Sequence, residues 1–101
     1  MILYNVTINI DDSVKDEWLQ WMKDKHIPDV LATELPLRYN IYQLLTRFDE
    51  ETGTTFSIQY FFEEMTSYEI YQQLHAPYLQ NEVIKKYDGK FTAFRTVMEE
   101  V

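Results

Sequence analysis

The chain has 101 residues, 46% of them hydrophobic, which is enough for one domain with a buried core and too few for two. The formal net charge of −8 makes nucleic acid and anionic membranes poor candidate partners, since both attract basic residues. The sequence has no cysteine, which excludes disulfides, thiol nucleophiles and thiolate metal ligands. We therefore expect one domain over residues 1–101.

The first strand is expected over residues 2–10, where apolar side chains alternate with Asn5, Thr7 and Asn9. These polar residues also interrupt any signal-type apolar run. No stretch approaches the roughly 20 apolar residues that span a bilayer. The sequence thus predicts a half-buried strand and a cytoplasmic protein.

A helix is expected next, because residues 11–13 supply N-cap chemistry. Trp18, Met22 and His26 follow at intervals of four, so they share one face of that helix. Pro28 disfavours helical geometry at the residue before it, so the helix is expected to stop near His26, with at most one separate turn after it.

The middle of the chain predicts a hairpin. Residues 35–37 form a connector, and residues 38–48 form a second strand with two mixed faces. A turn over residues 49–53 leads into a third strand over residues 54–62.

The second helix is expected to open at residues 66–69, which have capping-box form. Pro77 interrupts it, but proline is favoured at the first position of a new helical segment. A turn at Gly89 ends this helix, and residues 91–98 form the last strand.

The tripeptides His26-Ile27-Pro28 and His75-Ala76-Pro77 hold the only two histidines and indicate a two-fold pseudo-repeat. The order βαββαβ predicts an α+β, ferredoxin-like fold, in which a four-stranded antiparallel sheet carries two helices on one face. The strands at residues 2–10 and 54–62 are expected in its centre.

The other face of these two strands is polar but uncharged. It carries Leu3, Asn5, Thr7, Asn9, Thr55, Ser57, Gln59 and Phe61. Amides and hydroxyls suit a covered, hydrogen-bonded surface, so we expect a second copy to cover this face and form a homodimer. The alternative is a monomer with a hydrated, amide-rich face.

The segments MILYNVT (residues 1–7), EWLQWM (17–22) and HIPDV (26–30) resemble a bacterial family that is a domain of unknown function. That family is similar to the dimeric α+β barrel superfamily, which includes antibiotic-biosynthesis monooxygenases, EthD-like and NIPSNAP-like proteins. The resemblance covers nearly the whole chain. It implies two protomers packed sheet to sheet, with clefts between helices and sheet that bind small molecules. It implies no catalytic residues, because no enzyme motif of those relatives is present.

His26 is the best candidate for chemistry, because it ends an apolar stripe and lies three residues before Asp29. It would act as a general base or donate a hydrogen bond to a ligand; alternatively, it caps helix carbonyls. His75 occupies the matching position. A two-histidine metal site within one protomer is not favoured, because the pseudo-two-fold places the two helix ends at opposite ends of the protomer. A site shared across a dimer is the alternative. No cofactor is predicted.

The remaining candidates are aromatic or basic. Trp18, Trp21 and Tyr71 either form the wall of an aromatic cleft or belong to the core. Arg95 requires a carboxylate from Glu63 or Glu64 or from a ligand, unless it is simply an edge-strand charge that deters aggregation. The predicted ligand-binding residues are Trp18, Trp21, Met22, Tyr4, Tyr60, Tyr71, His75 and Arg95.

Three functions are compatible with these features. The first is a homodimeric barrel that binds a small, partly aromatic molecule. The second is a cofactor-independent monooxygenase or isomerase that uses His26 as base. The third is a dimeric interaction module without a ligand. A cavity that touches His26 and Trp18 would favour the first two, and a filled interior would favour the third.

Overall fold

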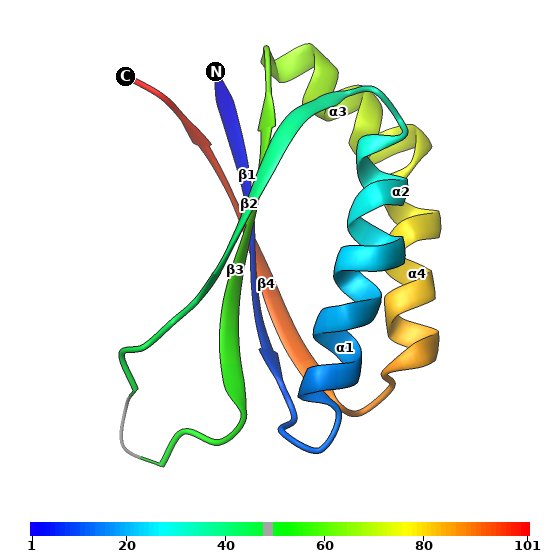
Figure 1. The fold of residues 1–101 in the computed structure, drawn as a ribbon. Coiled ribbons are helices and arrows are strands. Elements are labelled where there is room, and N and C mark those ends of the chain that lie inside the picture. Colours follow the sequence, from blue (N-terminus) through cyan, green and yellow to red (C-terminus); the bar gives the residue numbers. More distant parts are fainter. Residues whose placement is uncertain (48–49) are drawn as a thin grey trace.

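The computed structural model describes residues 1–47 and 50–101. Its antiparallel sheet has the strand order β2 (Pro36–Gln43), β3 (Thr54–Phe62), β1 (Ile2–Ile10) and β4 (Phe91–Glu99). All the helices lie on one side of this sheet (Figure 1). The predicted ferredoxin-like α+β fold is therefore confirmed, with the first and third strands in the centre.

The first helical run does not stop at Pro28, so that prediction was wrong. It continues from α1 (Lys15–Trp21) through a π-helical turn η1 (Met22–His26) into α2 (Ile27–Leu31). In the π turn the Ile27 N–H bonds to the Met22 carbonyl, five residues back. Proline lacks an N–H and clashes with the carbonyl four residues before it, and the wider turn relieves both problems.

The second helical run is split as predicted. It consists of α3 (Met65–Leu74) and α4 (Ala76–Lys86), with His75 between them and Pro77 in the first turn of α4. The position of Pro77 agrees with the preference of proline for the first turn of a helix.

The two predicted N-caps are wrong. No side chain caps α1, and the Asp11 Oδ1 instead accepts a 2.8 Å bond from the Ser13 N–H within the preceding turn. The Asp12 carboxylate does not cap the helix either. It accepts a 2.7 Å hydrogen bond from the Thr54 hydroxyl at the start of β3. The capping box does not form either, since α3 begins at Met65 without a side-chain cap.

The observed strand boundaries match the predicted ones best for the two central strands of the sheet. The bounds of β1 and β3 are as predicted, and β4 extends one residue further, to Glu99. Strand β2 begins earlier, at Pro36, and ends at Gln43, so residues 44–47 were wrongly assigned to it. Phe48 and Asp49, where the predicted strand and turn meet, lie outside the described residues.

The core lies between the helices and one face of the sheet. Trp18 is completely buried, and its ring centroid is 5.0 Å from that of Phe56 in β3. None of the described helices lies on the opposite face of the sheet (Figure 1), which holds the half-buried polar residues expected there. On that face the Ser57 hydroxyl donates to the Asn5 Oδ1 over 2.6 Å, and the Asn5 amide donates to the Thr7 Oγ1 over 2.9 Å.

Candidate functional site

A cavity of about 190 Å³ lies between the helices and the sheet. Six predicted site residues line it: Tyr4, Met22, His26, Tyr60, Tyr71 and Arg95. Nine further lining residues were not predicted: Val6, Ile8, Ile58, Gln80, Val83, Ile84, Phe91, Thr92 and Ala93. The walls therefore come from β1, β3, β4, η1, α3 and α4, and no single segment of the sequence contains the site.

The cavity opens between α4 and the edge strand β4. Its exposed lining residues, Ile84, Thr92 and Arg95, all belong to these two elements. Its inner wall is buried, with Tyr60 and Tyr71 each only 3% exposed. A ligand would enter past the mouth and meet aromatic rings inside.

The π turn carries His26 into this cavity. Behind it, the Trp21 ring stacks on the imidazole with centroids 5.5 Å apart, and the Tyr87 ring meets Trp21 edge-on at 5.8 Å. Trp21 therefore supports His26 and does not line the cavity. A π turn often occurs at functional sites, because it turns a side chain away from the regular helical register.

Burial lowers the pKa of His26 from 6.5 to about 4. The Asp29 carboxylate opposes this shift, while the positive charges of Lys25 and Arg95 add to it. His26 is therefore a neutral imidazole at pH 7. Its buried Nδ1 has no hydrogen-bond partner within residues 1–47 and 50–101. A neutral imidazole carries one donor and one acceptor nitrogen, so it can pair with either kind of group on a ligand.

Three tyrosine rings form the inner wall. The Tyr4 ring lies 6.2 Å from Tyr60 and 6.3 Å from Tyr71. Burial raises the pKa of Tyr60 well above its ordinary value and raises the pKa of Tyr71 too, so both hydroxyls stay protonated at neutral pH. The buried Tyr60 hydroxyl has no partner in the described part of the chain.

Arg95 lies at the mouth. It pairs with Val6 in the β1–β4 ladder, so it shares the helix-covered face of the sheet. The predicted ion pair with Glu63 or Glu64 is not formed. Among the residues that the structure describes, Arg95 has neither an ion pair nor a hydrogen bond. The two glutamates follow the end of β3, whereas Arg95 is in the middle of β4, which explains the difference.

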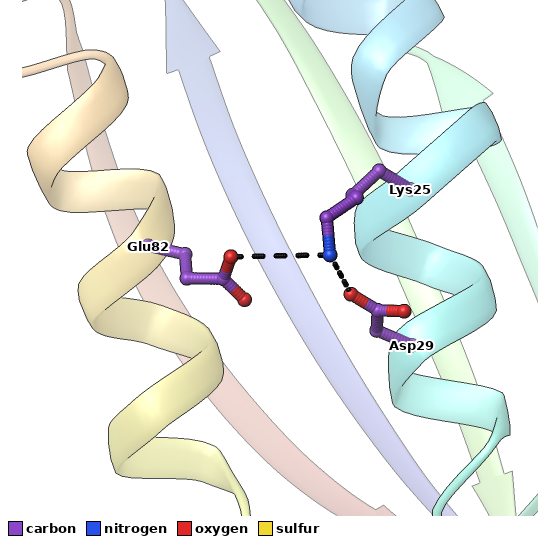
Figure 2. Close-up of polar contacts among 3 residues, drawn as sticks. All are labelled: Lys25, Asp29 and Glu82. Carbon is purple, nitrogen blue, oxygen red and sulfur yellow. Dashed lines mark hydrogen bonds and ion pairs between the residues drawn. The ribbon is translucent and has the colours of Figure 1, made fainter.

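An ion pair network joins the two helical runs that flank the cavity. Figure 2 shows Lys25 of η1 between Asp29 of the same run and Glu82 of α4. The Lys25 Nζ lies 4.0 Å from the Glu82 carboxylate. The Lys25 and Asp29 side chains are exposed to solvent, so this pair contributes little to the stability of the fold.

Besides Trp21, two more predicted site residues, Trp18 and His75, do not line the cavity. Trp18 is part of the core against Phe56. His75 lies at the α3–α4 junction, where its ring is 6.4 Å from Tyr71, and it borders a separate surface groove with Leu74 and Tyr78. The cavity thus touches His26 without touching Trp18.

Most of the missed residues have no distinctive sequence signal. Val83, Phe91 and Ala93 are ordinary apolar residues of a helix and an edge strand. Gln80 is a half-buried amide in α4, and its burial is known only from the structure, so the sequence held no signal for it either.

Over the described ranges, no group of three or more histidine, aspartate and glutamate side chains is arranged to hold a metal ion. No helix among these residues is long and apolar enough to cross a membrane.

The comparisons with known proteins support the fold. A family model described as "Domain of unknown function (DUF4286)" matches residues 1–101. No curated protein matches the sequence significantly.

Several solved structures are similar to this chain over its full length. An ethyl tert-butyl ether D (EthD) family protein from Bacillus halodurans has a TM-score of 0.68 at 10% identity, with 100% of both chains covered. A protein from Arabidopsis thaliana has a TM-score of 0.74 at 12% identity, with 100% of this chain and 96% of that chain covered. A candidate antibiotic biosynthesis monooxygenase from Nitrosomonas europaea has a TM-score of 0.70 at 8% identity, with 100% and 99% covered. These likenesses confirm the predicted superfamily resemblance at the level of the fold.

Proposed function

Because the chain belongs to the DUF4286 family, whose function is unknown, we propose from the site that it is a cytoplasmic homodimer that binds a small, partly aromatic molecule between helices and sheet. The observation that carries this proposal is the pair of unpartnered buried polar atoms, the Tyr60 hydroxyl and the His26 Nδ1, on side chains that line the cavity. Buried polar groups nearly always have a hydrogen-bond partner, and a ligand would supply one here.

The size of the cavity supports a small ligand. An engineered apolar cavity of about 150 Å³ binds benzene. The cavity of about 190 Å³ therefore has room for one substituted ring. The tyrosine rings of the inner wall favour an aromatic ligand through stacked and edge-to-face contacts.

The test is a thermal-shift screen with one-ring aromatic compounds, followed by titration of any compound that raises the melting temperature. Ala93→Leu fills the cavity from β4, because Ala93 is one of its lining residues. Ala32→Leu is the matched control at an exposed position after α2. We expect binding to the parent and to the control, and none to Ala93→Leu. If no compound binds the parent, or if Ala93→Leu binds equally well, the proposed site is wrong.

The homodimer is proposed through the face of the sheet that carries no helix. Besides its half-buried amides, this face exposes three large side chains, Tyr42, Phe94 and Met98, at 54%, 63% and 42%. The superfamily resemblance, in which protomers pack sheet to sheet, favours a second copy as the occupant. Closed two-fold dimers are the commonest oligomers, and aromatic residues and methionine are enriched in protein interfaces.

Light scattering after size exclusion tests this assembly at micromolar concentration. Phe94→Glu places a charge on the proposed interface, and Leu74→Glu places the same charge on α3, where Leu74 is 70% exposed. We expect dimers for the parent and for Leu74→Glu, and monomers for Phe94→Glu. A monomeric parent would contradict the proposal. A dimeric parent that binds no aromatic compound would favour the interaction module over the binding protein.

A second candidate function is cofactor-independent oxygenation or isomerisation of an electron-rich aromatic in the same cavity. It is favoured by the neutral imidazole of His26, which has an unpartnered nitrogen beside the ligand space. A pKa of about 4 makes this imidazole a weak base, so catalysis ranks second to binding. Turnover of a compound found in the screen would be lost in His26→Ala. Unchanged turnover in that variant would exclude His26 as the base.

A further inference from the structure

The charges that line the cavity differ from those of the protein as a whole. The sequence has 17 acidic residues and a formal net charge of −8. None of the acidic residues that the structure describes lines the cavity, and Arg95 is the lining residue with a permanent charge. Since His26 and the two buried tyrosines are neutral at pH 7, the described walls carry one positive charge and no negative charge.

The position of Arg95 leaves its guanidinium available. It is exposed on an edge strand, it lies at the mouth beside Ile84, and no described residue pairs with it. A guanidinium presents a planar fork of N–H donors that matches a carboxylate with two parallel hydrogen bonds. The hydroxyl of Tyr60, on β3 and two strands away from Arg95, is an additional donor.

We infer that the ligand is an aromatic carboxylate of one ring, whose carboxylate pairs with Arg95 at the mouth and whose ring lies against the inner tyrosines. This inference rests on the proposed function and adds the chemical class of the ligand. The described lining has a positive charge at Arg95 and no acidic residue, so it favours an anionic aromatic over a cationic one. A polar substituent on the far side of the ring would meet the Tyr60 hydroxyl or the His26 imidazole.

The test compares anionic probes with neutral isosteres by titration calorimetry. The probes are benzoate and 4-hydroxybenzoate, with benzamide and 4-hydroxybenzamide as their uncharged counterparts. We expect the parent to bind the carboxylates at least about tenfold more tightly than the amides, because hydrogen bonds to charged groups are the stronger ones.

Two variants and a control assign the effect to Arg95. Arg95→Gln removes the charge, and we expect it to weaken benzoate binding about tenfold while benzamide binding stays unchanged. Arg95→Lys keeps the charge without the planar fork, and its affinity for benzoate should lie between that of the parent and that of Arg95→Gln. Lys85→Gln changes the net charge equally on the exposed side of α4, and it should leave both affinities unchanged.

The outcomes separate this inference from the function on which it rests. If the parent binds amides as tightly as carboxylates, or if Arg95→Gln binds benzoate like the parent, the inference is wrong and the aromatic site remains. If no aromatic compound of either charge binds, both the site and the inference are wrong.

Discussion

Acidification should lower the unfolding free energy of this protein, because His26 is buried as a neutral imidazole. The size of the loss follows from the pKa shift that this burial causes. The pKa of His26 is about 4 in the folded state, whereas an unfolded histidine titrates near 6.5. Between these two values the unfolded chain binds a proton that the folded chain does not, so stability falls as the pH falls. The loss begins near pH 6.5 and is complete near pH 4. A shift of about 2.5 pH units corresponds to about 3 kcal/mol of unfolding free energy.

The assay is urea unfolding of the parent and of His26→Gln over this pH range. Both chains contain the same carboxylates, so the contributions of the acidic residues cancel in the difference between their unfolding free energies. The parent should lose about 3 kcal/mol more than the variant between pH 7 and pH 4. If the unfolding free energies of the two proteins change in parallel with pH, the inference that His26 is a buried, neutral imidazole is refuted.

Proton NMR gives an independent measurement of the same pKa. The sequence has two histidines, so His75→Gln leaves His26 as the source of the imidazole signals. We expect a titration midpoint near pH 4 in the folded protein. A midpoint near 6.5 would mean that His26 is hydrated, and it would remove one of the two observations behind the proposed cavity site.

Three further predictions concern stability and are measured by urea unfolding. Tyr60→Phe should leave the unfolding free energy unchanged or raise it, because it removes a buried hydroxyl without a partner; a loss of more than about 1 kcal/mol would show that the hydroxyl is bonded. Gly53→Ala should cost more than Gly89→Ala: both residues have positive φ, of 76° and 73°, but a Cβ at Gly53 would lie 2.6 Å from the Asn9 Oδ1, whereas at Gly89 it meets nothing within 4 Å. The left-handed strain alone is about 1–2 kcal/mol, so equal losses would contradict the close approach at Gly53. Trp18→Ala should cost about 3–5 kcal/mol, because the ring is completely buried, and a loss below about 1 kcal/mol would contradict its place in the core.

The sequence was sufficient for the fold because the strand pattern is local and strong. Alternation along residues 2–10 and 54–62 specifies which side chains face the helices, and one slip of register would expose all of them. The split of the second helical run at His75 was also predictable, since Pro77 fits a helix start.

The sequence did not determine the path of the chain at Pro28. A local rule ends the helix there, yet the helix continues through a π turn and buries Met22 and Ile27 on the sheet. Packing of these apolar side chains outweighs the loss of regular hydrogen bonds, and that gain exists only once the sheet is in place. The same turn brings His26 beside the cavity.

What the sequence determined by itself is the order of the elements, the face that each one buries and the identity of six residues that line the cavity. Only the tertiary structure decided that Trp18 belongs to the core, that Gln80 and Ile84 border the space, and that Arg95 finds no carboxylate. The physical reason is that periodicity specifies directions along one element. The distance between two elements, and therefore the space and the ion pairs between them, depends on how all their side chains pack together.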